Sequence, residues 1–209
     1  MQNSSSFLAA DGGGTIGHME RLKQRIVEEG RVLSGQVLNV NTFLNHGVDP
    51  ELIADIGRAF AARFRGAGVT RVMTIESSGI AVAYATALEL KVPLVFARRR
   101  KALMNDGEYY SERVPSFTKG IVTDIVVSKE LLKANDRILF VDDFIANGDA
   151  AKGLMRIIEH SGAKLVGAGI VIEKSFQAGG NMLREAGIDV ESLARIASLD
   201  NGTVRFVEE

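Results

Sequence analysis

"RILFVDDFIANGDAAKGL", residues 137–154, is the stretch that decides the fold. It begins with a continuous apolar run, 138–141, which is typical of a strand buried on both faces of a sheet. Two adjacent carboxylates, Asp142 and Asp143, follow this run, and a short loop containing Gly148 leads directly into a helical pattern. A buried strand that ends in acids and turns into a helix is typical of a ligand site in an α/β sheet.

The rest of the chain repeats this alternation of strands and helices. Strands are expected at 71–76, 93–99, 121–127, 137–143 and 164–173, with short ones at 195–199 and 203–207. Helices are expected at 19–29, from Pro50 to the glycines at 66–68, and at 79–90, 148–160 and 179–187. This pattern predicts a single α/β domain with a mainly parallel sheet covered by helices on both faces, and strand 121–127 antiparallel at one side.

Composition limits the classes of protein that the chain can represent. It has 209 residues and no cysteine, which excludes disulfides and thiolate metal sites and fits a cytoplasmic protein. Residues 1–18 are rich in Ser and Gly and lack periodicity, so we interpret them as a leader outside the domain, which then covers 19–209. That domain holds 25 basic and 25 acidic residues, because the leader contributes one acid, Asp11, and no base. Neutral charge and the absence of a long apolar run give no support to binding of nucleic acid or membranes.

Three strand ends carry polar residues, and each allows more than one interpretation. "ESSG" (76–79) is either common turn chemistry or an anion site at a helix N-terminus. "ARRRK" (97–101) is either a solvated basic loop or a site for a polyanion. Asp142 and Asp143 act either as turn and cap residues, or as carboxylates that accept bonds from sugar hydroxyls or hold a metal. Together with the helix start near Gly148, the three ends favour a sugar phosphate as ligand.

Two common nucleotide motifs are missing from the chain. No GxxxxGK[ST] sequence occurs, which argues against a P-loop nucleotide hydrolase. No GxGxxG follows a strand, since "GAGIVIE" (167–173) lies inside a strand pattern. A dinucleotide-binding turn is therefore not predicted.

"ILFVDDFIANGDA" (138–150) resembles the phosphoribosyl-diphosphate signature of the type I phosphoribosyltransferases. Further segments resemble the bacterial xanthine phosphoribosyltransferases within that family, in the expected order and over nearly all of 19–209: "VLNVNTFLNH", "TIESSGIA", "VPLVFARRRK", "SFTK", "GIVIEKSF" and "VESLARIASL". The resemblance implies the type I phosphoribosyltransferase fold, a parallel sheet flanked by helices with a small hood from the N- and C-terminal segments and a flexible loop. It implies a purine-salvage enzyme that joins xanthine N9 to the ribose C1 of phosphoribosyl diphosphate.

The resemblance also implies roles for particular residues on the phosphoribosyl diphosphate side. Asp142 and Asp143 would face the ribose and stabilise the positive charge that develops at C1 as pyrophosphate leaves. The 5′-phosphate would bind mainly to backbone N–H groups of Ala146, Asn147, Gly148, Asp149 and Ala150. The pyrophosphate would bind at Ser77, Ser78 and Gly79, assisted by Arg98 and the cations that follow it. The broader signature has threonines and a second glycine where this chain has Ala146, Asn147 and Asp149, and we expect Asp149 to point away from the phosphate and to cap or favour the helix N-terminus.

On the purine side, the resemblance implies xanthine contacts from Leu38, Asn45 and Lys174. Taken alone, Lys174 is equally an exposed lysine at a strand end, and Asn45 a residue that stabilises a turn. The polar stretch 105–120 matches the flexible loop that closes over the substrates, with Ser116 and Lys119 in its best-matched part.

The implied cofactor is Mg²⁺, bound with the diphosphate substrate through few or no protein ligands, and the implied assembly is a homodimer. Two alternatives remain open. A guanine or hypoxanthine phosphoribosyltransferase differs only in the base. A non-catalytic regulator that senses phosphoribosyl diphosphate and binds DNA would need an additional helix-turn-helix and a basic face, and only about fifty residues precede the first expected sheet strand.

Overall fold

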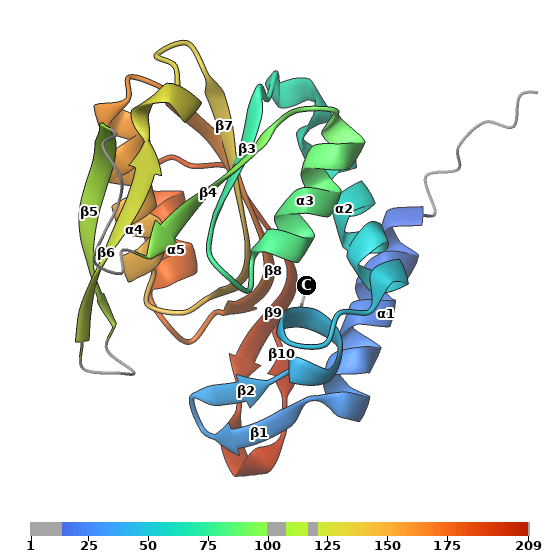
Figure 1. Ribbon diagram of the computed structural model, residues 1–209. Helices are drawn as coiled ribbons and strands as arrows, with labels where there is room; N and C mark the ends of the chain where they lie inside the picture. The colour runs from blue at the N-terminus through green and yellow to red at the C-terminus, as the bar shows by residue number, and fades with distance from the viewer. Residues whose placement is uncertain (1–13, 100–107, 117–120, 209) are drawn as a thin grey trace, which may run out of the picture.

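The computed structural model describes residues 14–99, 108–116 and 121–208, and an eight-stranded sheet forms the centre of this part of the chain (Figure 1). The strands lie in the order β10-β9-β8-β7-β3-β4-β6-β5. Their bounds are β3 (Arg71–Ile75), β4 (Leu94–Arg99), β5 (Tyr109–Ser116), β6 (Ile121–Ser128), β7 (Arg137–Ile145), β8 (Lys164–Lys174), β9 (Val190–Ser198) and β10 (Arg205–Phe206). The five strands from β9 to β4 are parallel, whereas β6, β5 and β10 are antiparallel at the edges. The predicted mainly parallel sheet is confirmed.

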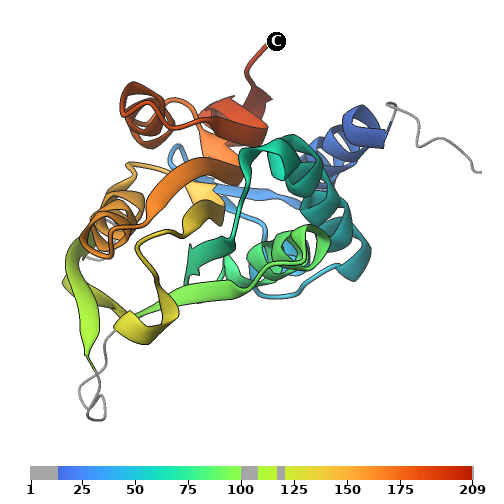
Figure 2. The ribbon, with the colours of Figure 1, turned by 90° about the horizontal axis from the view of Figure 1, so that it is seen from above.

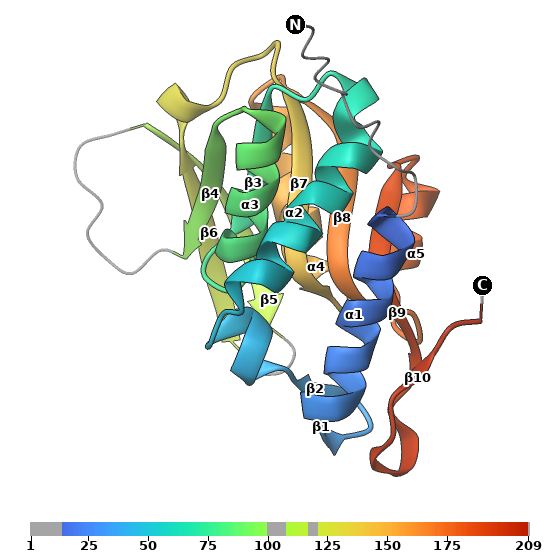
Figure 3. The same cartoon turned by 90° about the vertical axis from the view of Figure 1, so that its right-hand side faces the viewer.

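Helices cover both faces of the sheet, as Figures 2 and 3 show. One layer contains α1 (Gly14–Glu29), α2 (Pro50–Phe64) and α3 (Ile80–Leu90), and the other contains α4 (Asp149–His160) and α5 (Gly179–Glu185). Strand β7 supplies both cores, because its side chains alternate between the faces. Leu139 and Val141 pack in the core under α1, α2 and α3, and Ile138 and Phe140 pack in the core under α4 and α5. The continuous apolar run at 138–141 follows from this double burial.

Helix α2 starts where its sequence predicts. The carboxylate of Asp49 accepts hydrogen bonds from the backbone N–H groups of Glu51 and Leu52, and Pro50 occupies the first helical position. The apolar face expected at four-residue spacing is buried along its whole length: Leu52, Ile56, Phe60 and Phe64.

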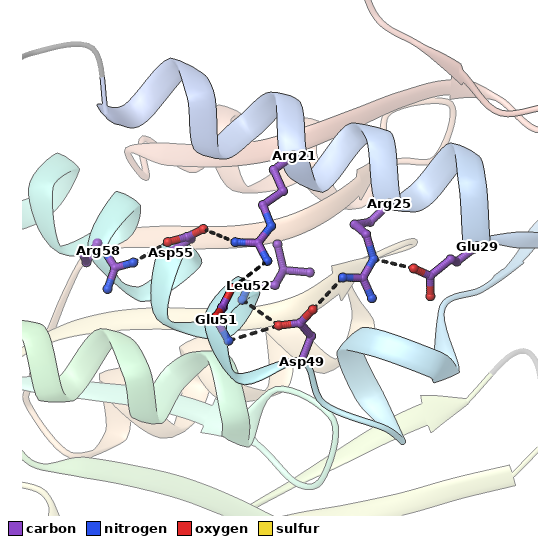
Figure 4. Close-up of polar contacts among 8 residues, drawn as sticks. All are labelled: Arg21, Arg25, Glu29, Asp49, Glu51, Leu52, Asp55 and Arg58. Atoms are coloured by element: carbon purple, nitrogen blue, oxygen red, sulfur yellow. Dashed lines mark hydrogen bonds and ion pairs between the residues drawn. The ribbon is translucent and has the colours of Figure 1, made fainter.

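A seam of ion pairs joins α1 to α2 (Figure 4). Arg25 lies 2.5 Å from Asp49 and 2.6 Å from Glu29, and Arg21 lies 3.1 Å from Asp55. The Leu52 N–H group and the guanidinium of Arg25 together lower the pKa of Asp49. Helix α1 begins at Gly14, earlier than the predicted residue 19.

Other differences from the prediction lie at the edges. Strand β5 forms within the stretch expected to be a polar loop, and it pairs with β6 along its whole length. Strand β9 begins at Val190 rather than 195, and β10 spans only Arg205–Phe206. Edge strands such as β5 depend on pairing with a neighbour, so their own sequence carries a weak signal.

The hood is made from both ends of the domain. Strands β1 (Arg31–Ser34) and β2 (Val37–Asn39) form a hairpin, and a short π-helix follows at Asn41–Asn45. Strand β1 contacts the 3-10 turn Asp200–Gly202 near the C-terminus. Among the residues that the structure describes, no helix has the length and apolar character needed to cross a membrane.

Candidate active site

A cavity of about 220 Å³ lies beside the carboxyl end of β7. It is lined by Arg99 from β4, Val114 and Pro115 from β5, and residues of β7 and the start of α4. The carboxyl ends of parallel strands meet at one edge of a sheet, which is where α/β proteins bind ligands. Of the three polar strand ends, the cavity takes Asp142 with the β7–α4 loop and Arg99 of the cationic run, whereas residues 76–79 are not part of its lining.

Asp142 lies at this cavity and is partly buried. Its Oδ1 accepts a hydrogen bond of 3.0 Å from the backbone N–H of Asp143. Burial raises the pKa of the Asp142 carboxyl well above its usual value, the negative charge of Asp143 raises it further, and Arg99 opposes both. Gly79 packs directly against this carboxylate, where a Cβ atom would collide with Asp142 Oδ1 and Thr74 Oγ1.

Asp143 has a different environment from its neighbour, with only 4% of its surface exposed. Its Oδ1 accepts a hydrogen bond of 2.9 Å from Ser78 Oγ, and its Oδ2 accepts one of 3.1 Å from Asn45 Nδ2. Asp143 thus joins the β3–α3 turn to the π-helix of the hood. The other side-chain atom of the Asn45 amide, Oδ1, is buried without a hydrogen-bond partner.

The loop between β7 and α4 turns at Gly148, which has a φ of 83° and serves as the N-cap of α4. Glycine is favoured at this position because a positive φ is costly for residues that carry a side chain. Residues on both sides of Gly148 line the cavity: Ala146, Asn147, Asp149 and Ala150. Gly148, whose positive φ makes the turn, takes the N-cap position, and Asp149 is the first residue of α4, where a carboxylate favours the helix N-terminus. The first N–H groups of α4 have no partner within the helix.

The β3–α3 turn and the end of β4 lie next to each other through Glu76. The backbone N–H of Arg99 donates to Glu76 Oε1 at 2.7 Å, and Arg98 Nε lies 3.5 Å from Glu76 Oε2. Arg98 is mostly exposed, whereas Arg99 lines the cavity. Ser77 is exposed beside this contact, and the Glu76–Ser77 peptide bond is cis.

Lys174 connects the end of β8 to the hood. Its Nζ donates a hydrogen bond of 2.5 Å to the carbonyl oxygen of Gln36 and lies 5.6 Å from the centre of the Phe144 ring. Burial lowers the pKa of Lys174. Leu38 is 7% exposed, packs in the core, and is paired with Val32 in the β1–β2 hairpin.

The two flexible-loop residues lie at the limit of the described chain. Lys119 lies outside the described residues, and of Ser116 the structure describes the backbone, which pairs with Ile121 at the end of β5. Among residues 14–99, 108–116 and 121–208, no group of three or more His, Asp or Glu could hold a metal ion.

Comparisons with known proteins give the family. The phosphoribosyl transferase domain matches residues 48–180. Over 191 residues the chain is 54% identical to a xanthine phosphoribosyltransferase of Bacillus mycoides, covering 91% of this chain and 97% of the relative. It is 53% identical over 189 residues to a xanthine phosphoribosyltransferase of Moorella thermoacetica, with 90% of this chain and 96% of the relative covered. The chain belongs to the xanthine phosphoribosyltransferase family.

Solved structures of phosphoribosyltransferases confirm the fold class. An adenine phosphoribosyltransferase from Rhodothermus marinus superposes with a TM-score of 0.70 at 23% identity, covering 87% of this chain and 99% of that one. An adenine phosphoribosyltransferase from Saccharomyces cerevisiae gives a TM-score of 0.68 at 20% identity, with 85% and 99% covered. The predicted type I phosphoribosyltransferase fold is therefore confirmed.

Within this family fold, some cavity residues carried no sequence signal of their own. Phe144 lines the cavity and lies under Lys174, but in the sequence it is one apolar residue among several. Arg99 was expected only as one member of the cationic run that begins at Arg98. The sequence did not indicate which of these two side chains would be the more buried. Val114 and Pro115 belong to β5, which was expected to be a loop.

Proposed function

We propose that the protein transfers the 5-phosphoribosyl group of phosphoribosyl diphosphate to xanthine, giving xanthosine 5′-monophosphate and pyrophosphate. The C1–N9 bond forms as the C1–oxygen bond to the diphosphate breaks, the diphosphate leaves with the electron pair, and the N9 proton passes to solvent. The observation that carries the proposal is the convergence of the β7–α4 loop, the β3–α3 turn and the hood on Asp142 and Asp143. The 54% identity to proteins named xanthine phosphoribosyltransferase supports the choice of base.

In this proposal the 5′-phosphate binds at the start of α4. Residues 146–150 offer backbone N–H groups there, and the positive end of the helix dipole favours a dianion. Asp149 is also one of the residues that line the cavity, and we propose that the phosphate approaches the backbone on the side away from its carboxylate.

The two aspartates take separate roles in the proposal. Asp142, which lines the cavity, stabilises the positive charge that develops at C1. Asp143 faces the ribose less directly, because both of its oxygens accept hydrogen bonds from other side chains. Through these hydrogen bonds Asp143 fixes the positions of the Ser78 hydroxyl and the Asn45 amide next to the sugar.

Pyrophosphate binds in this account at Ser77, Ser78 and Gly79, with Arg98 and Arg99 on its other side. A Mg²⁺ ion bound with the diphosphate would supply charge neutralisation for this leaving group. A Mg²⁺ ion held mainly by phosphate oxygens and water suits the residues here, since it needs only one or two carboxylates and Asp142 supplies one at the cavity.

Xanthine occupies the side of the site nearest the hood. Lys174 releases the Gln36 carbonyl and donates to a purine carbonyl oxygen, while Phe144 provides an apolar ring surface. Asn45 presents its amide to the edge of the base that carries the 2-oxygen, and Leu38 contributes a backbone contact. A site that hydrogen-bonds this oxygen rejects a purine that lacks it.

Replacing Lys174 by alanine is expected to raise KM for xanthine by about tenfold or more, because a hydrogen bond from a charged donor is lost. KM for phosphoribosyl diphosphate should stay unchanged, since Lys174 lies at the hood rather than at the phosphate loop. Initial rates with each substrate varied in turn measure both constants. Lys164→Ala, an exposed lysine at the opposite end of β8, is the matched control. Equal losses for the two substrates would contradict the role of Lys174.

The remaining parts of the proposal concern closure and assembly. Ser116 and Lys119 belong to the loop that closes over the substrates and keeps water from the sugar. The working unit is a cytoplasmic homodimer of a single domain, residues 19–209, whose first helix extends back to Gly14. Tyr84 and Leu88, one turn apart on α3 and 60% and 62% exposed, support an assembled state because they leave an apolar helix surface uncovered.

Chromatography of the reaction products tests the proposed function. Incubation of the protein with xanthine, phosphoribosyl diphosphate and Mg²⁺ should yield xanthosine 5′-monophosphate and pyrophosphate in equal amounts. Removal of the metal with EDTA should stop the reaction. Binding of phosphoribosyl diphosphate without any product would instead favour the regulator.

A further inference from the structure

Glu173 is a buried carboxylate that the proposed reaction does not use. It is 1% exposed and lies on β8 opposite Ile145, the residue before the phosphate loop. Arg184 donates to both of its oxygens, at 2.9 and 2.7 Å. Ser175 and Ser192 donate one further hydrogen bond each, and Arg195 Nε lies 3.6 Å from Oε1, so all of these contacts come from side chains around the carboxylate.

The carboxylate of Glu173 remains charged in this environment. Burial by itself would raise the pKa of Glu173, but the hydrogen bonds from Arg184 and the serines lower it to about 2. A buried charge with this many partners fixes the positions of the elements that supply them. The principal partner, Arg184, is on α5.

Helix α5 needs such an anchor, because it has only seven residues and begins with two glycines. A helix this short is unstable by itself, and glycine weakens it further. Gly180 packs directly on the Glu173 carboxylate, where a Cβ atom would lie 2.5 Å from Oε1. The helix is therefore held against Glu173 at its start by Gly180 and near its end by Arg184.

The opposite side of α5 supports the phosphate loop. The backbone N–H of Gly179 donates to the carbonyl of Ala146 at 2.8 Å. Gly148 packs so closely that a Cβ atom there would lie 2.9 Å from Gly179 Cα and 2.7 Å from Met182 Cε. The same short helix thus contacts Glu173 on one side and residues 146–148 on the other.

We infer that Glu173 is a positioning residue for the 5′-phosphate: through Arg184 it holds α5, and α5 holds the backbone of residues 146–148. The inference rests on the proposed function, which assigns the 5′-phosphate to this loop. Glu173 itself touches no substrate.

The test is calorimetric titration with ribose 5-phosphate, together with KM for each substrate. Glu173→Gln should weaken ribose 5-phosphate binding and raise KM for phosphoribosyl diphosphate by about tenfold, as expected when binding groups are misplaced. KM for xanthine should not change. Arg184→Lys keeps the charge but loses the paired hydrogen bonds, so it should weaken ribose 5-phosphate binding to a smaller extent. This second variant tests the inference if Glu173→Gln does not fold.

Asp136→Asn is the matched control. Asp136 is a buried acid bound by an arginine, Arg71 at 2.7 Å, but it precedes β7 at the end of the sheet away from the cavity. The Asp136→Asn variant should have a lower melting temperature than the wild type and the same affinity for ribose 5-phosphate. Unchanged ribose 5-phosphate binding in folded Glu173→Gln and Arg184→Lys, or an equal rise in KM for xanthine, would overturn the inference. A wild type that binds ribose 5-phosphate but transfers it to no purine would overturn the proposed function alone.

Discussion

An Asp142→Asn variant is expected to lose about a hundredfold or more in kcat and yet to unfold at a higher temperature than the wild type. The loss of activity follows from removing the carboxylate at the cavity that is proposed to stabilise the developing charge at C1. The gain in stability follows from the same charge, because burial and the neighbouring Asp143 raise the pKa of Asp142. Asparagine keeps the shape and the oxygen that accepts the Asp143 N–H group.

The gain in melting temperature of Asp142→Asn over the wild type should increase with pH. A carboxyl whose pKa is raised by folding stabilises the native state below the unfolded pKa, about 3.9 for Asp, and loses that contribution as pH rises through the folded value. The melting-temperature difference between Asp142→Asn and wild type should therefore be present at pH 8 and disappear toward pH 4. In the wild type, kcat/KM for phosphoribosyl diphosphate should fall as pH drops through the raised pKa, and the variant should lack this fall.

Thermal unfolding across pH and initial rates measure these effects on one pair of proteins. A variant with full kcat would remove Asp142 from the chemistry. A variant that unfolds at a lower temperature at pH 8 would show that the charged carboxylate is not destabilising, contrary to its position beside Asp143.

Gly148→Ala is expected to raise KM for phosphoribosyl diphosphate by about tenfold or more. The new methyl group would meet Gly179 Cα at 2.9 Å and Met182 Cε at 2.7 Å, so the loop must move away from α5. The positive φ of 83° adds a cost of about 1–2 kcal/mol to the free energy of folding. KM for xanthine should change little, because the base is proposed to bind at the hood.

Gly187→Ala separates these two effects. Gly187 has a φ of 76° and open space where a Cβ atom would lie, and it is in the turn after α5. It should lose a similar amount of stability and keep the wild-type KM for phosphoribosyl diphosphate. If Gly187→Ala raised this KM as much as Gly148→Ala does, the phosphate loop would have no special dependence on its contact with α5.

Most strands of the sheet could be predicted from the sequence, because burial of side chains in the core leaves a strong hydrophobic pattern. The apolar run at 138–141 and the four-residue spacing in α2 both follow from side chains packed on the core, and both elements form as predicted. Strand β5 shows where the pattern fails, since it pairs with β6 along its whole length while only Val114 among its described side chains is fully buried. The hairpin of β1 and β2 was likewise expected only as an irregular segment with a short strand.

For the candidate site, the sequence predicted which residues lie at the strand ends but not how they pair. Asp142 and Asp143 are adjacent and chemically identical, yet one lines the cavity and the other is buried between Ser78 and Asn45. The alternation of side chains along β7 separates them, and the partners come from segments far away in the sequence. The support of the phosphate loop by Glu173 was hidden for the same reason, because Arg184 belongs to another element.

The most direct test of the central claim is kcat/KM for xanthine, guanine and hypoxanthine, measured by absorbance with saturating phosphoribosyl diphosphate and Mg²⁺. We expect kcat/KM for xanthine to exceed the values for guanine and hypoxanthine by about tenfold or more, because the hood is proposed to bind the 2-oxygen of the base. A higher value for guanine or hypoxanthine would overturn the assignment of the base, and no turnover with any of the three would contradict the account as a whole.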